Sequence, residues 1–379
     1  MEKTKVKFSI LGKIYSWMKG NKTEFLLLLF IIIVGAFLRL YKIDQYMTFL
    51  GDEGRDVIIV RRLLVYGDPI LIGPGTSIGN MYLGPLYYYM MAPALFLAGF
   101  SPVGPAIQVA LLGVITIFWV WWIGREWFGK IAGLLASGLF AVAPTVIIYS
   151  RSSWNPNIMP FFSLLSIYSI WKVYESRGAS RGVGWWLIIL GISYAFVLQS
   201  HYLGLLLAPT LAMFWLATYL RIRNSELIGN WKLPACRRGR EIGKFLRYSI
   251  VSLVLFAGLM SPLLIFDARH GWRNFAAMKQ FFSVRQETVS AKPWNAIPKM
   301  WPEFIKVNTR LVTGRNELVG KWLSVAIVAL LIWLVLTKKK ELVYHATSYI
   351  LLATWFGFAL LGLGLYKQEI YDHYFGFFF

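Results

Sequence analysis

Long apolar runs recur along this 379-residue chain and constrain its fold more than any other feature. A run of roughly 20 apolar residues is long enough to cross the hydrocarbon core of a bilayer as a helix. Because backbone groups in lipid must pair within their own segment, such runs predict helices. We therefore predict an all-α, polytopic transmembrane helical bundle. Its spans are predicted at 25–41, 105–123, 131–149, 158–173, 185–198, 203–220, 248–266, 322–336 and 343–365.

The charged residues fit a membrane protein better than a nucleic-acid-binding protein. Lys and Arg outnumber Asp and Glu by 39 to 18, and loops on the cytoplasmic side of membrane proteins are enriched in Lys and Arg. If the spans alternate, the basic loops 175–184, 221–247 and 337–342 share one side with the Lys-rich segment 1–24. We therefore predict a multi-pass protein of the cell membrane with its N-terminus inside. No zinc-finger or ribonucleoprotein motif is present, so no nucleic-acid partner is predicted.

The predicted domain organisation is a basic cytoplasmic segment, 1–24, followed by one transmembrane domain, 25–379. No small-residue cleavage site follows the first apolar run, so this run is interpreted as an uncleaved first helix. Two long loops, 42–103 and 267–320, fall on the outer side. The last apolar stretch, 375–379, is too short to cross a bilayer at 1.5 Å per residue. We therefore expect the chain to be truncated at its C-terminus.

An acidic cluster opens the first outer loop, directly after the first predicted span. Asp52, Glu53 and Asp56 precede an amphipathic stretch, 57–66, that is typical of a helix lying along the membrane surface. Carboxylates are favoured near a helix N-terminus because the helix dipole is positive there. Two interpretations stay open from this pattern alone. Asp52 either serves only as a helix cap or belongs to a catalytic site.

The order of these features resembles the GT-C membrane glycosyltransferases, which place an Asp-Glu pair in the first outer loop and follow it with an interfacial helix. Within them the chain is most similar to glycosyltransferase family 39, the bacterial relatives of protein O-mannosyltransferases and aminoarabinose transferases. Three further segments resemble this family: Gly-Pro-Leu-Tyr-Tyr-Tyr at 84–89, Arg-Ser-Ser-Trp-Asn-Pro-Asn at 151–157 and Tyr-Asp-His-Tyr at 371–374. The chain departs from the family pattern at Gly84, where a proline is usual.

The resemblance implies an inverting sugar transfer from a polyprenyl-phosphate donor to a hydroxyl acceptor on the outer face of the membrane. Asp52 is the expected general base, because a carboxylate suits removal of the acceptor proton. Glu53 is expected to orient the acceptor or to support Asp52. The departing phosphate calls for cationic partners. The candidates for donor-phosphate or substrate binding are Arg55, Arg151, His201, Arg269 and His270.

Several alternatives stay open. No cofactor and no dedicated metal site are predicted, although a weak Mg²⁺ or Mn²⁺ site at the acidic cluster is left open. The sequence also leaves open whether the sugar is a hexose or a pentose. It leaves open whether the acceptor is a lipid, a cell-wall glycan or a protein. A flippase for lipid-linked saccharides is the main alternative, and it predicts ionisable residues in mid-span. The predicted spans hold few of these. A scaffold without chemistry would not explain the two elaborate outer loops.

Overall fold

The structure is a computed structural model that describes residues 10–76, 81–176, 182–224, 235–283, 289–290, 292–367 and 369–376. Every regular element within these ranges is a helix, and the strand-like pairing there is limited to two isolated bridges. The prediction of an all-α fold is confirmed. The α-helices are α1 (Ile10–Gly20), α2 (Lys22–Leu40), α3 (Ile43–Tyr46), α4 (Gly51–Tyr66), α5 (Leu86–Leu97), α6 (Val103–Phe128), α7 (Lys130–Val142), α8 (Pro144–Ser150), α9 (Met159–Glu175), α10 (Val183–Ser200), α11 (Ala208–Arg223), α12 (Ala235–Arg269), α13 (Arg273–Ser283), α14 (Ile297–Leu311), α15 (Glu317–Thr337), α16 (Lys339–Tyr344) and α17 (Ala346–Leu365).

Seven helices in the described ranges are long and apolar enough to cross a membrane. They are α2, α6, α10, α11 with the preceding 3-10 turn Tyr202–Leu207, α12, α15 and α17, and the bent pair α7–α8 makes an eighth candidate. The prediction of a multi-span membrane protein is confirmed. The predicted span 158–173 coincides with α9, which has only 17 residues and is largely buried by its neighbours.

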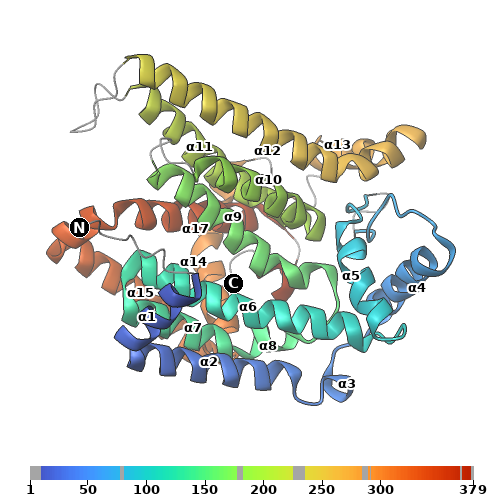
Figure 1. The fold of residues 1–379 in the computed structure, drawn as a ribbon, viewed down its shortest axis with the longest axis horizontal. Coiled ribbons are helices and arrows are strands. Elements are labelled where there is room, and N and C mark those ends of the chain that lie inside the picture. The colour runs from blue at the N-terminus through green and yellow to red at the C-terminus, as the bar shows by residue number, and fades with distance from the viewer. Residues whose placement is uncertain are drawn as a thin grey trace, which may run out of the picture.

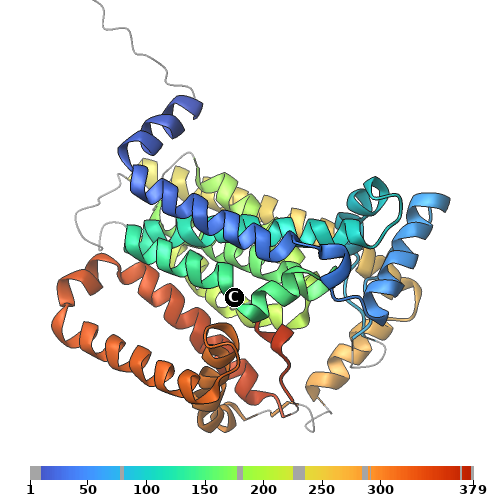
Figure 2. The ribbon, with the colours of Figure 1, turned by 90° about the horizontal axis from the view of Figure 1, so that it is seen from below.

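The helices lie side by side and give the bundle two distinct ends (Figure 1). Helix α1, the end of α11 and the start of α12 lie at one end, whereas α4, α5 and α13 gather at the other. Helix α6 packs between α2, α7 and α9, and α10 packs between α9 and α12. Helix α15 stands to one side of this core (Figure 2), whereas α17 packs against α9, α11 and α14. The two ends are called the α1 end and the α4 end below.

The predicted span 131–149 is not one straight helix, because the chain bends by 62° between α7 and α8. Pro144 lacks the N–H that would bond to the carbonyl of Phe140 four residues earlier. Arg39 supplies the missing donor: its Nη2 lies 3.1 Å from the Phe140 oxygen and its Nη1 2.9 Å from the Ala141 oxygen. After the bend, α8 packs against α2, α6 and α14 and supplies one wall of the site.

Two predicted loops are largely helical. The prediction of a loop over 221–247 is wrong in its second half, because α12 begins at Ala235. Lys and Arg are good helix formers, so the helix extends beyond its apolar part, which alone marks a span. The predicted outer loop 267–320 contains α13 and α14, and α14 packs against α15 and α17.

Candidate active site

Helix α4 starts with a closed cap formed by Glu53. Its Oε2 accepts a 2.9 Å hydrogen bond from the Leu50 N–H, and its Oε1 accepts a 2.5 Å hydrogen bond from the Ser152 hydroxyl. A carboxylate three residues after the N-cap is the usual partner for the cap N–H. The Glu53 side chain is buried, so both of its oxygens are committed to the protein. Glu53 therefore fastens α4 to the turn that follows α8.

Asp52 lies beside this cap, but its carboxylate is open to solvent. Its side chain is 48% exposed, and its Oδ1 pairs with Nη1 of Arg55 at 2.8 Å. The N-cap residue of α4 is Leu50, and the Glu53 side chain bonds to its N–H. Asp52 therefore does not serve as the helix cap. Its other oxygen makes no hydrogen bond or ion pair with a described residue, as a general base needs.

Arg55 is shared between two carboxylates of different character. Its Nη2 and Nε lie 2.7 and 2.9 Å from Oδ1 of Asp56. Asp56 is fully buried, and the Tyr88 hydroxyl donates a 2.8 Å hydrogen bond to the same oxygen. Oδ2 of Asp56 has no partner among the described residues. Burial raises the pKa of Asp56 to about 6, against the opposing effect of Arg55.

A cavity of about 310 Å³ opens beside the start of α4. Asp52 and Glu53 line one side, and α8 contributes Thr145 and Tyr149. The turn after α8 adds Ser152 and Trp154, and Arg315 closes the lining from the loop after α14. The cavity has the size of a small-molecule site and combines an exposed carboxylate with a cation and aromatic rings.

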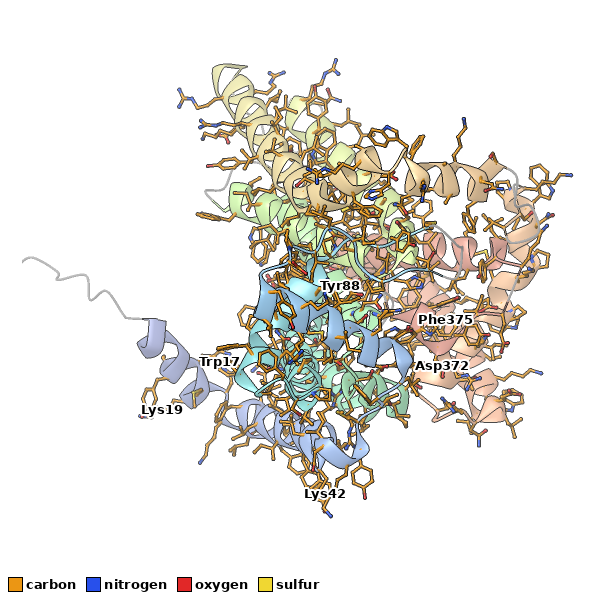
Figure 3. The ribbon with its side chains drawn as sticks, turned by 90° about the vertical axis from the view of Figure 1, so that its right-hand side faces the viewer. Trp17, Lys19, Lys42, Tyr88, Asp372 and Phe375 are labelled. Carbon is orange, nitrogen blue, oxygen red and sulfur yellow. The ribbon has the colours of Figure 1, made fainter. Side chains whose placement is uncertain are left out.

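Arg315 is held in place by Asp372. The Asp372 carboxylate lies 3.0 Å from Nη2 of Arg315 and 3.3 Å from Nε of Arg310. Arg315 itself has a φ of 74°, in the left-handed region that non-glycine residues rarely adopt. Its guanidinium is 58% exposed, so donors remain available at the cavity. Figure 3 shows the bundle from the α4 end, with Tyr88 and Asp372 labelled.

Two histidines lie behind the Trp154 wall. The His373 ring centroid is 4.5 Å from that of Trp154 and 5.9 Å from that of His201. Nδ1 of His201 accepts a hydrogen bond from the Leu203 N–H at 3.2 Å. Burial lowers the pKa of His201 to about 3 and that of His373 to about 4. Both rings are therefore neutral near pH 7, and His201 is not a cationic partner for phosphate.

The other predicted binding residues lie elsewhere. Arg151 donates through Nη2 to the Tyr41 carbonyl at 3.0 Å, and its guanidinium lies over the Tyr46 ring, so it closes the end of α2. Arg269 and His270 lie at the end of α12, and His270 stacks on Phe266. None of the three lines the cavity. The structure thus brings together Asp52, Glu53 and Arg55, with His201 one layer behind.

Sequence reasoning missed Arg310 and Arg315, because the apolar pattern predicts a loop over 267–320. The helical spacing of Lys299, Glu303, Lys306 and Arg310 was the signal that could have found α14. No group of three or more His, Cys, Asp and Glu side chains in the described ranges is placed to hold a metal ion. Asp52 and Asp56 instead share the cation of Arg55.

Residues 83–229 match the family model described as dolichyl-phosphate-mannose-protein mannosyltransferase. The match confirms the resemblance to the membrane glycosyltransferases. It covers the chain from just before α5 to just after α11. Asp52 and Glu53 precede the matched segment, whereas Arg315 and Asp372 follow it. A comparison with curated protein sequences finds no match.

Two solved structures are similar to the chain at low identity. One is the archaeal oligosaccharyltransferase AglB from Archaeoglobus fulgidus in complex with an inhibitory peptide and a dolichol-phosphate, at 13% identity and a TM-score of 0.44, covering 92% of this chain and 50% of that one. The other is ArnT from Cupriavidus metallidurans bound to undecaprenyl phosphate, at 15% identity and a TM-score of 0.42, covering 93% and 61%. The chain thus spans about half the length of the first and under two thirds of the second. Neither likeness assigns residues of this chain.

Proposed function

We propose that the chain is an inverting glycosyltransferase that moves a sugar from a polyprenyl-phosphate donor to a hydroxyl acceptor. The observation that carries the proposal is the half-exposed Asp52 carboxylate on a cavity that also contains Arg315 and Trp154. A carboxylate, a cation and an aromatic face are the groups that transfer from a sugar phosphate requires. The family match to mannosyltransferases that use dolichyl phosphate supports the donor class.

In the proposed reaction the acceptor oxygen attacks the anomeric carbon from the face opposite the phosphate. Asp52 takes the hydroxyl proton as the new carbon–oxygen bond forms. The bond from the anomeric carbon to the phosphate oxygen breaks, and its electron pair leaves with the phosphate. Arg315 stabilises the negative charge on that phosphate. A single displacement of this kind inverts the anomeric centre.

The proposed location is the outer face of the cell membrane. The predicted basic loops border the α1 end, since α11 ends and α12 begins there (Figure 1). Basic loops face the cytoplasm, so the N-terminus is inside and the cavity at the α4 end is outside. A lipid-linked donor in the outer leaflet would reach the cavity from the side of the bundle.

The test is sugar transfer from radiolabelled polyprenyl-phosphate mannose, and then other sugars on the same lipid, by the purified chain in proteoliposomes. Asp52→Asn should lower kcat by about 10²–10⁴-fold, the usual contribution of a general base. Asp44→Asn, an exposed carboxylate on neighbouring α3, is the matched control. Equal activity of Asp52→Asn and Asp44→Asn would exclude Asp52 as the base. Movement of the lipid-linked sugar across the bilayer without transfer would establish the flippase instead.

A further inference from the structure

A second and larger cavity lies at the α1 end, away from Asp52. It has a volume of about 860 Å³ and lies between α6 and α10, with α9 as its floor. On α9 its lining begins at Tyr168, whereas the proposed catalytic cavity borders the turn before α9. At 1.5 Å per residue, the stretch of α9 before Tyr168 separates the two cavities by roughly 14 Å. The second cavity is therefore not part of the proposed catalytic site.

Aromatic rings form most of the wall of this cavity. The Tyr168 ring packs against Trp119, Trp171 and Trp186, with centroid distances of 5.5, 5.9 and 5.2 Å. Trp122 directs its indole N–H to the Tyr168 hydroxyl at 3.0 Å. This indole is bonded within the protein, unlike an interface tryptophan that only anchors a helix in the headgroup layer. In the cage that these rings form, Tyr168 and Trp171 are buried, whereas Trp122 is 42% exposed and accessible to an ammonium group.

An ionic network lies within the cage and carries an excess of negative charge. Glu126 accepts a 2.5 Å hydrogen bond from the Tyr168 hydroxyl and pairs with the Lys172 ammonium. Lys172 also lies over the Tyr168 and Trp171 rings, 5.2 and 5.1 Å from their centroids. Glu175, on the rim, is exposed and makes no ion pair with any described residue. The cavity thus has two carboxylates for one ammonium.

The cavity also offers a cation. The Lys172 side chain is 26% exposed, and its ammonium is a point charge that suits a phosphate oxygen.

We propose that this cavity binds the headgroup of a zwitterionic phospholipid with a primary amine, taken from the leaflet at the α1 end. The lipid ammonium pairs with Glu175 beside the Trp122 ring, and the lipid phosphate accepts from Lys172. The walls come from α6 and α10, two candidate membrane spans, so a ligand carried by the membrane enters between their ends. The excess carboxylate selects against an anionic lipid.

The test is native mass spectrometry of the purified full-length chain with phosphatidylethanolamine, phosphatidylcholine and phosphatidylglycerol of matched acyl chains. Phosphatidylethanolamine should bind tightest, because its ammonium both donates hydrogen bonds and carries charge. Glu175→Lys should weaken its binding by roughly three- to fivefold, the range of one partly exposed ionic contact, and should strengthen binding of phosphatidylglycerol. Glu341→Lys, which reverses an exposed carboxylate on α16, is the matched control.

Two further measurements distinguish recognition of the headgroup from binding of the acyl chains. Soluble phosphoethanolamine should compete with phosphatidylethanolamine, since the headgroup carries the recognition. Trp122→Leu should weaken binding while leaving the thermal unfolding temperature near that of the parent, because Trp122 is 42% exposed. Equal binding of the three lipids, no competition by phosphoethanolamine, or identical behaviour of Glu175→Lys and Glu341→Lys would each overturn the proposal.

Discussion

The Ser152 hydroxyl donates a 2.5 Å hydrogen bond to Oε1 of Glu53 and so joins the turn after α8 to the first turn of α4. These two segments are 99 residues apart in the sequence. The second oxygen of Glu53 is used by the α4 cap. The bond therefore fixes Asp52, the preceding residue, against the wall that contains Trp154.

Ser152→Ala tests this connection. The change leaves one buried oxygen of Glu53 without its donor, at a cost of about 1–3 kcal/mol in the free energy of unfolding. Because Asp52 loses its fixed position, kcat should fall more than KM rises. The measurements are denaturant unfolding and sugar transfer. Ser153→Ala is the control, since this neighbouring hydroxyl makes no hydrogen bond to a described residue; equal effects of the two changes would contradict the argument.

Arg315→Ala tests the proposed phosphate partner. Removal of a half-exposed guanidinium should lower kcat/KM by about tenfold, less than for a buried charge because solvent screens it. Arg315→Lys keeps the charge and should recover part of the loss. The readout is transfer at several donor concentrations. Lys321→Ala, an exposed cation on α15, should retain the parent's kcat/KM, and an Arg315→Ala value equal to it would remove Arg315 from the mechanism.

Asp56 should make stability depend on pH in a direction opposite to that of most carboxylates. Its pKa is raised from 3.8 to about 6, so the folded state binds more protons than the unfolded state between these values. Stability must therefore fall as pH rises through this window. Across the whole window, the contribution of Asp56 to the free energy of unfolding falls by about 3 kcal/mol.

The comparison of the parent with Asp56→Asn isolates this contribution, because the amide does not titrate. The stability of the parent relative to Asp56→Asn should decrease from pH 4 to pH 6 and stay constant above. Thermal unfolding across that range measures it. A constant difference between the two proteins would show that Asp56 keeps an ordinary pKa.

The helical class, most spans and the acidic cluster were predictable from the sequence, because apolar length and charge are local properties. The bend within the predicted span 131–149 was not predictable, since a break at Pro144 is stable only where a distant group such as Arg39 replaces the lost donor. The catalytic role of Asp52 stays a prediction. The placement of Arg315 and Asp372 was out of reach, because it depends on α14 packing against α15 and α17.

The two histidines behind the cavity should make the protein sensitive to acid. Their folded pKa values, about 3 for His201 and about 4 for His373, lie below the ordinary 6.5. The unfolded state therefore binds more protons, and stability is lost as pH falls from 6.5 toward 4. His201→Gln should reduce this loss relative to the parent in thermal unfolding at pH 7 and pH 5. An unchanged pH dependence would contradict a buried neutral His201.

Substitution of Arg39 should lower the stability of the protein more than any other substitution in the first span. It is fully buried, and its guanidinium bonds to three carbonyls and to the Ser150 hydroxyl. Arg39→Met has a similar length but no donors, so the carbonyls of Phe140 and Ala141 lose their partners. The free energy of unfolding should fall by about 3 kcal/mol or more, since each buried acceptor left unpaired costs about 1–3 kcal/mol.

The same change also tests whether the bend between α7 and α8 serves the site. With the bend relaxed, Ser152 moves relative to Glu53, so Arg39→Met should lower kcat even at a temperature where the protein stays folded. Arg39→Lys restores one donor and should give an intermediate stability. If Arg39→Met unfolds at the parent's temperature, the carbonyls at the bend do not need Arg39, and Pro144 must be accommodated by the helix itself.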